Sequence, residues 1–171
     1  MLSQLRRIVQ DVAQEPVLNN ALAGLVSNVK NALKTECCSV YLADYEQQHF
    51  MLMATDGLNP EAVGQISIGF SEGLIGWVGQ REEPINLAQA HLHPRFKVTP
   101  EVSEDRFSAF LGCPIIHHRK VLGVLTIQQG ESRVFSEDEE SFLVTLGVQL
   151  ASVLVNAEMR QAASQNSKQQ K

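Results

Sequence analysis

Two apolar runs separated by a short polar patch dominate the hydrophobic pattern of this chain. The runs are Phe110 to Ile116 and Val121 to Ile127, and the patch between them reads His-His-Arg-Lys. Apolar runs of this length with a tight polar break predict two antiparallel strands joined in a hairpin. Because both runs are apolar on successive residues rather than alternating, we expect both faces of the hairpin to be covered and the hairpin to lie at the centre of a sheet.

Apolar residues recur at helical spacing in the first part of the chain. Residues 2–12 form one such stretch, and Pro16 ends or kinks the helix that they predict. A second stretch predicts a helix from about Val17 to Leu33. These two apolar stripes are longer than a short amphipathic leader helix would require. We therefore expect them to cover a face of the sheet or to take part in a dimer interface.

A third helical stripe follows the hairpin. Ser136 and Glu139 have the spacing of a capping box, which predicts that this helix begins after Ser136. Its apolar stripe continues to about Arg160. Residues 161–171 are polar without a period, so we interpret them as a linker to domains missing from this sequence.

Shorter segments complete the predicted sheet. Residues 37–43 and 49–55 predict a second pair of strands, residues 65–68 a short edge strand and residues 84–87 a brief extended piece. Gly73, Gly76 and Gly79 recur in a predicted helix between these last two segments, where they would permit close packing. No Lys-Ser/Thr pair follows these glycines, so we do not interpret them as a phosphate-binding loop. This order of elements predicts an α+β domain with an antiparallel sheet and helices on both faces.

The composition and charge exclude several classes of function. Hydrophobic residues make up 44% of the chain and charged residues 19%, as in an ordinary globular domain. The formal net charge is −5 and Lys and Arg form no stripe, which disfavours nucleic-acid binding. The apolar runs are shorter than a membrane span and the first residues lack a secretory signal, so we expect a cytoplasmic protein without a membrane segment.

Candidate catalytic and metal-binding groups are sparse. His91 and His93 have the spacing of a metal-binding pair but lack a third ligand nearby in sequence, so we favour two loop histidines. Cys37, Cys38 and Cys113 have no CxxC spacing, and we expect reduced thiols that pack as small hydrophobes. No nucleophile elbow or catalytic triad can be picked out by spacing. We therefore expect no catalytic residue, no metal and no cofactor in this fragment.

Seven motifs follow one another over residues 17–160: CSVYLAD, MATDGL, EGLIGWVGQ, EPINLAQAHLHPRF, AFLGCPII, VLGVLTIQ and FSEDEESFLVTLGVQLASVL. Their order is similar to that of a GAF domain. Within that family the chain looks closest to the amino-terminal sensory domain of nitrogen-branch enzyme I, a phosphoenolpyruvate–protein phosphotransferase. Residues 1–16 would then be an N-terminal helix, residues 17–160 the GAF domain, and residues 161–171 the linker to missing catalytic domains.

The resemblance implies a GAF fold whose central antiparallel sheet has the strand order 2-1-5-4-3. It also implies a ligand pocket on one face of the sheet and terminal helices on the other face, which often dimerise. The family's phosphohistidine motif, Thr-Ser-His preceded by glycines, does not occur in these residues. This fragment would therefore be a regulatory module without transferase activity of its own.

The resemblance further implies a role in nitrogen regulation and signal transduction. Glutamine and 2-oxoglutarate are the expected effectors, and they would control autophosphorylation of downstream domains. The full-length protein would use Mg²⁺ and would pass the phosphate to a nitrogen-branch HPr carrier. The cysteines here lie on or next to strands rather than in the helix-loop layer, so we reject the role of GAF-like methionine sulfoxide reductases.

A pocket for a small polar anion needs a cation and hydrogen-bonding groups in an apolar shell. Arg95, Lys97 and Arg106 flank the predicted polar loop over residues 97–105 and could supply the charge. The residues that we expect to approach the ligand are Tyr41, Asn86, Phe96, Arg106, Ser108, Thr126 and Gln128.

Two alternatives remain open from the sequence. Thr126 and Gln128 could end their strand near solvent while Tyr41 is plain core. The domain as a whole could be a homodimerisation or protein-interaction module with a vestigial pocket, because its terminal helices carry long apolar stripes and strong ligand chemistry is scarce elsewhere.

Overall fold

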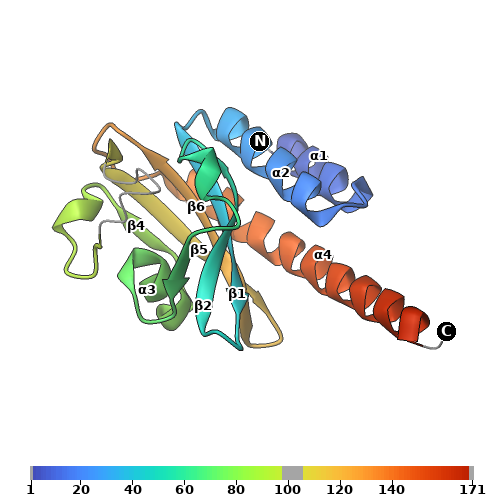
Figure 1. The fold of residues 1–171 in the computed structure, drawn as a ribbon. Helices are drawn as coiled ribbons and strands as arrows, with labels where there is room; N and C mark the ends of the chain where they lie inside the picture. Colours follow the sequence, from blue (N-terminus) through green and yellow to red (C-terminus); the bar gives the residue numbers. More distant parts are fainter. Residues whose placement is uncertain (1, 98–105, 170–171) are drawn as a thin grey trace.

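The computed structural model describes residues 2–97 and 106–169, and it has three layers (Figure 1). A six-stranded sheet forms the middle layer. Helices α1 (Leu2–Gln14), α2 (Leu18–Leu33) and α4 (Glu137–Gln169) pack on one face, and α3 (Gly73–Arg81) packs on the other. The predicted polar loop lies mostly outside the described residues, because residues 98–105 are not among them.

The sheet is antiparallel throughout and has the strand order β3-β2-β1-β6-β5-β4. Its strands are β1 (Cys37–Asp44), β2 (His49–Asp56), β3 (Ser67–Gly69), β4 (Ile85–Leu87), β5 (Ala109–His117) and β6 (Lys120–Gln129). The expected order 2-1-5-4-3 is contained in it, because removing the edge strand β3 and renumbering the rest gives that order. The α+β fold with helices on both faces is confirmed, and the order differs in detail by one edge strand.

The hairpin β5–β6 lies inside the sheet as its sequence predicts, with β1 on one side and β4 on the other. Leu111, Ile115, Leu125 and Ile127 are fully buried on the face toward the terminal helices. The turn places both His118 (φ 49°) and Arg119 (φ 65°) in the left-handed region. Two-residue turns with positive φ at both positions match the twist of a hairpin, although Asn-Gly is the usual sequence there.

The core under the terminal helices joins three helices and four strands. Its helical members include Leu22, Leu25 and Val29 of α2 and Leu143 and Leu146 of α4. Burying one such leucine stabilises the fold by roughly 1.5–3 kcal/mol relative to leaving it exposed. The apolar stripes predicted from helical spacing are therefore the faces by which the helices pack on the sheet and on one another.

Helix α4 is longer than its apolar stripe. We predicted its end at about Arg160, which is wrong, because the helix continues to Gln169. Its last residues include Gln, Ala and Lys, which favour helix without any apolar period, and no Gly or Pro interrupts them. Whether this segment also links to further domains stays a prediction.

The segment Glu137–Arg160 of α4 is long and apolar enough to cross a membrane by length and composition alone. Within it, 44% of the most apolar 18-residue window is buried inside the domain. Phe142, Leu146 and Leu150 belong to the core under the terminal helices, which explains the hydropathy of the segment as that of a core helix.

The predicted glycine-rich helix is α3, which begins at Gly73 soon after β3 ends at Gly69. Its glycines serve packing: a Cβ at Gly76 would lie 2.8 Å from the Phe70 carbonyl oxygen, and one at Gly79 would lie 2.7 Å from Cζ of Phe50. Only glycine lets α3 approach the neighbouring segment so closely.

Candidate functional site

A row of buried polar side chains crosses the face of the sheet that is covered by α3. Ser39 of β1 pairs with Thr126 of β6, which in turn pairs with Gly112 of β5. Gln128 lies two residues further along β6, on the same face, opposite Cys37. Ser39, Thr126 and Gln128 are at most 3% exposed. They form the polar floor of the α3 face, so the alternative that Thr126 and Gln128 lie near solvent does not hold.

The floor is only partly satisfied by its own hydrogen bonds. The hydroxyl groups of Ser39 and Thr55 lie 2.9 Å apart, and the Cys37 thiol lies 3.8 Å from Oε1 of Gln128. The hydroxyl of Thr126 is buried and has no hydrogen-bond partner within the described part of the chain. Buried hydroxyls normally have a partner, and one that lacks it costs roughly 1–3 kcal/mol. An unpaired hydroxyl at the centre of the floor therefore indicates where a polar ligand group could bind.

An apolar shell surrounds the polar floor. Tyr41, Leu52, Phe107, Phe110 and Val78 are among its buried members. A Cβ at Gly112 would lie 2.9 Å from Cγ2 of Val78 and from the Phe110 ring, so α3 rests directly on β5 at this point. Uncharged polar groups within an apolar shell are the usual composition of a small-molecule site.

Arg95, Lys97 and Arg106 border the α3 face, and the first two are already engaged with α3 or with the residues directly before it. The Arg95 guanidinium donates to the Ser71 carbonyl at 2.8 Å and lies 4.9 Å from the centre of the Trp77 ring. Lys97 pairs with Glu72 at 2.6 Å. Arg106 is exposed and stacks 4.7 Å from the Phe107 ring centre, and no described acidic side chain pairs with it. Arg106 is thus the cation with most freedom to meet an anionic group.

The structure brings together most of the residues that we expect around a ligand. Tyr41, Thr126 and Gln128 face α3, and Phe96 packs against the same apolar shell. Ser108 lies beside them, half-buried, and its carbonyl accepts the Ala90 amide at 2.8 Å. Arg106 lies at the border, as described above. Their contact with a ligand stays a prediction.

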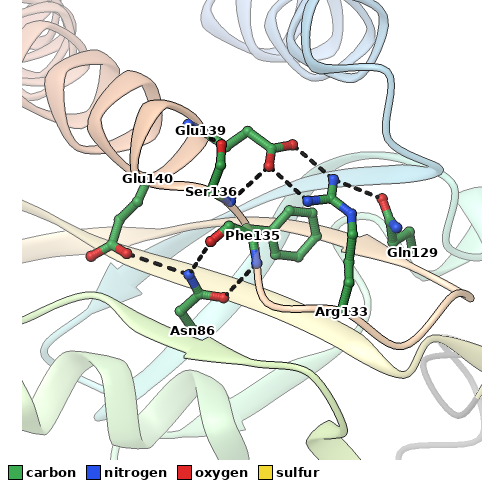
Figure 2. Close-up of polar contacts among 7 residues, drawn as sticks. All are labelled: Asn86, Gln129, Arg133, Phe135, Ser136, Glu139 and Glu140. Atoms are coloured by element: carbon green, nitrogen blue, oxygen red, sulfur yellow. Dashed lines mark hydrogen bonds and ion pairs between the residues drawn. The ribbon is translucent and has the colours of Figure 1, made fainter.

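Asn86 lies apart from this group, on the opposite face of the sheet. Its neighbours Ile85 and Leu87 pack on the α3 side, whereas Asn86 pairs with Leu111, a member of the core under the terminal helices. Its side-chain amide exchanges two hydrogen bonds with the backbone of Phe135, 3.0 Å to the N–H and 2.9 Å to the carbonyl (Figure 2).

The start of α4 is held by a second network that the sequence only partly revealed. Ser136 and Glu139 form the predicted capping box, with bonds of 2.8 Å and 3.2 Å. Arg133 binds both carboxylate oxygens of Glu139 at 2.7 Å and 2.8 Å and reaches Gln129 of β6 at 3.2 Å (Figure 2). The Arg133 guanidinium is the main cause that lowers the pKa of Glu139 to about 2. An Arg six residues before a capping Glu was the available signal, but spacing alone did not single it out.

Residues 18–154 match the model of the family described as "GAF domain". The chain belongs to the GAF domain family. It is 51% identical over 159 residues to a "Phosphoenolpyruvate-dependent phosphotransferase system" protein of Escherichia coli (strain K12). That match covers 93% of this chain and 21% of the relative, so this GAF domain spans about a fifth of the length of that protein.

Solved structures agree with this assignment. The GAF domain of a phosphoenolpyruvate-protein phosphotransferase from Coxiella burnetii superposes with a TM-score of 0.89 and 46% identity, over 94% of this chain and 96% of that one. The free methionine-R-sulfoxide reductase of Neisseria meningitidis has a TM-score of 0.77 at 20% identity, over 92% and 89% of the two chains. The second likeness shows the fold alone. The predicted resemblance to GAF domains of phosphoenolpyruvate–protein phosphotransferases is confirmed.

The three cysteines of this GAF domain are buried thiols that take no part in a disulfide. Burial raises the pKa of the Cys113 thiol to about 12 and that of Cys38 well above its ordinary value. A thiol that stays protonated at neutral pH is a poor nucleophile and a poor metal ligand. Cys38 and Cys113 therefore act as small hydrophobes in the core under the terminal helices.

The histidine pair in this GAF domain, His91 and His93, belongs to no metal-binding group within the described part of the chain. Nδ1 of His93 accepts the backbone N–H of Arg95 at 3.0 Å, which fixes its ring beside Trp77. Over residues 2–97 and 106–169, no three His, Cys, Asp or Glu side chains come together in a way that could hold a metal ion.

Proposed function

We propose that this GAF domain is the small-molecule-sensing, regulatory module of a nitrogen-branch phosphoenolpyruvate–protein phosphotransferase. Its ligand is glutamine or 2-oxoglutarate, and binding controls autophosphorylation of domains that follow in the cytoplasmic full-length protein. Those domains use Mg²⁺ and deliver phosphate to a nitrogen-branch HPr carrier. The fragment itself regulates and does not catalyse.

The buried hydroxyl of Thr126, which has no hydrogen-bond partner among the described residues, is the observation that carries the sensing role. It lies in the middle of a floor whose other polar groups, Ser39 and Gln128, are also uncharged. A ligand that reaches this floor must present a group able to hydrogen-bond without a counter-charge. Similarity to phosphotransferase GAF domains supplies the regulatory context.

The charges around the site weigh against 2-oxoglutarate as a fully buried ligand. A dicarboxylate needs a cation near each end when it is bound away from water, whereas Arg95 and Lys97 are engaged by α3. Glutamine can place its neutral carboxamide on the Thr126–Gln128 floor and its carboxylate near Arg106. Tyr41 and Ser108 then lie beside the ligand and Phe96 closes the apolar shell.

Calorimetric titration of the 171-residue chain with each compound tests this proposal. We expect heat and a rise in melting temperature with millimolar glutamine and a weaker response with 2-oxoglutarate. Aspartate and leucine serve as controls for charge and for apolar bulk. The absence of heat and of any melting shift with both effectors would contradict sensing by this domain.

A homodimerisation module remains the second candidate, supported by the outer surface of α4. Val144, Val148 and Met159 recur at helical spacing there, and Val148 and Met159 are 61% and 66% exposed. A groove of about 300 Å³ lies between α1 and α4, lined by Leu2, Leu5 and Val9 and, on α4, by Thr145 and Gln149, which adjoin Val144 and Val148 in sequence. Both roles are compatible in one domain, because the dimer surface and the polar floor lie on opposite faces of the sheet.

A further inference from the structure

Strand β4 faces two layers at once. Ile85 and Leu87 point toward α3 and pack in the apolar shell of the floor, and they pair with Gly112 and Phe110 of β5. Asn86, between them, points to the opposite face because side chains alternate along a strand. A shift of β4 caused from the α3 side therefore moves Asn86 on the other side.

Asn86 is bonded to the backbone of Phe135 as though that residue belonged to a neighbouring strand. Its Oδ1 accepts the Phe135 N–H at 3.0 Å, while its Nδ2 donates to the Phe135 carbonyl at 2.9 Å and lies 3.4 Å from Oε2 of Glu140 (Figure 2). A carboxamide can donate and accept together, so it holds a peptide unit in one orientation. Asp could only accept, and an apolar residue could do neither.

Phe135 is followed directly by the first turn of α4. Ser136 is the helix cap, and Glu139 and Glu140 lie in the first turn. A second bond joins the same two segments, since Oγ of Ser132 donates to the Ala88 carbonyl at 3.1 Å. Through these bonds the β4 segment and the start of α4 form one unit.

We propose that Asn86 is the positioning residue that transmits a displacement of β4 to α4. The proposal rests on the proposed function, because a ligand on the polar floor is what would press on Ile85 and Leu87. Helix α4 extends 33 residues from this point, about 50 Å at 1.5 Å per residue. A small rotation at its first turn thus becomes a displacement of several ångströms at its far end.

The coupling can be tested without any ligand. Leu87→Ala removes contacts on the α3 side of β4 and leaves the Asn86 bonds in place. We expect it to shift the backbone NMR signals of Phe135, Ser136 and Glu139, and we expect that shift to fall about threefold or more when Asn86→Ala is also present, as for two sites coupled through one contact. Asn59→Ala is the matched control, because Asn59 also bonds a backbone N–H but lies at η1 (Pro60–Ala62), away from α4.

Amide exchange supplies a second readout. Loss of the Asn86 bonds should speed exchange of the Phe135 amide by about tenfold, and the control should leave it unchanged. If Asn86→Ala folds poorly, Asn86→Asp takes its place. It keeps the acceptor for the Phe135 amide and loses the donor, so we expect an intermediate effect on exchange. Equal Leu87→Ala shifts with and without the Asn86 side chain, or no shift in α4 at all, would overturn the coupling.

Addition of glutamine then separates the coupling from the sensing role. In the native chain we expect bound glutamine to change exchange in the first turn of α4, and in Asn86→Ala we expect binding heat without that change. If glutamine changes exchange in the first turn of α4 equally in the native chain and in Asn86→Ala, Asn86 does not transmit the displacement. Absence of heat in both proteins rejects the sensing role alone, because the Leu87 comparison still decides the coupling.

Discussion

Removal of the Thr126 hydroxyl should leave the stability of the fold unchanged or raise it, and should weaken ligand binding. Thr126→Val keeps the shape of the side chain and removes a buried group that has no described partner. We therefore expect an unchanged or higher free energy of unfolding in urea, because a buried unpaired hydroxyl destabilises. The affinity for glutamine should fall about tenfold with loss of one hydrogen bond.

Thr55→Val is the matched control for that substitution. Its hydroxyl is paired with Ser39 at 2.9 Å and accepts the Leu58 N–H at 3.2 Å. Its removal should lower the free energy of unfolding by roughly 1–2 kcal/mol. A Thr126→Val protein that is as destabilised as Thr55→Val, with glutamine binding intact, would argue for a purely structural hydroxyl.

Glu139 gives the domain a defined acid sensitivity. Its pKa is lowered from 4.5 to about 2, chiefly by Arg133. A carboxyl whose pKa is lower in the folded state stabilises the protein fully above about pH 4.5, and that contribution is lost as the pH falls through about 2.

Glu139→Gln should therefore lower the free energy of unfolding at pH 7 by about 1–2 kcal/mol, since partial exposure of Arg133 weakens the pair. Urea unfolding between pH 7 and pH 2 is the measurement, and the difference between native and variant should shrink below pH 4.5. A difference that is constant with pH would show that the charge of Glu139 is not what stabilises the cap. Glu137→Gln, at an acid with no described salt bridge, is the control.

At the level of elements, the close packing of α3 on the sheet depends on Gly112 of β5. Gly112→Ala would place a methyl group 2.9 Å from Cγ2 of Val78 and should displace α3. We expect a loss of about 1–3 kcal/mol in the free energy of unfolding. Gly24→Ala on α2 has no atom within 4 Å of its new methyl group and should stabilise by about 0.5–1 kcal/mol. Thermal unfolding of both variants checks the contrast, and similar effects of the two would contradict it.

Some elements were predictable because their determinants are local. The double apolar runs around His117 to Lys120 predicted the central hairpin, and Ser136 with Glu139 predicted the cap of α4. The end of α4 was predicted too early, because its apolar stripe stops at about Arg160 while residues that favour helix continue beyond it. The contact of Asn86 with Phe135 could not be predicted for a different reason. The two residues are 49 positions apart in the sequence, and only the fold brings them together.

The polar floor was predictable in part from strand alternation. Placing Thr126 with Gln128 on one face needed only the period of a strand, whereas the absence of a partner for Thr126 required the neighbouring strands. The engagement of Arg95 and Lys97 by α3 likewise depends on tertiary contacts. The sequence offered Arg95, Lys97 and Arg106 as sources of charge and placed Arg106 among the ligand residues, but only the structure shows that Arg95 and Lys97 are already engaged.

For the molecule as a whole, the exposed valines of α4 predict self-association. Val148→Asp should leave folding nearly unchanged, because the side chain is 61% exposed, and should convert a dimer at tens of micromolar into monomer. Val134→Asp, an equally exposed valine before α4, is the control and should remain dimeric. Light scattering gives the mass directly, and a native chain that is already monomeric would reject the dimer.

The two faces of the sheet also differ in how firmly they are closed. Three helices of 13 to 33 residues cover one face, while the other is covered by the nine-residue α3 together with two single-turn pieces, η1 (Pro60–Ala62) and η2 (Ala90–Leu92). Segments with short elements open locally at a lower free energy than the whole domain unfolds. The α3 side should therefore open locally while the terminal helices stay folded. Such opening would give a ligand access to the polar floor, which is otherwise buried. The rate of ligand entry should then depend on temperature as the rate of a local opening reaction does.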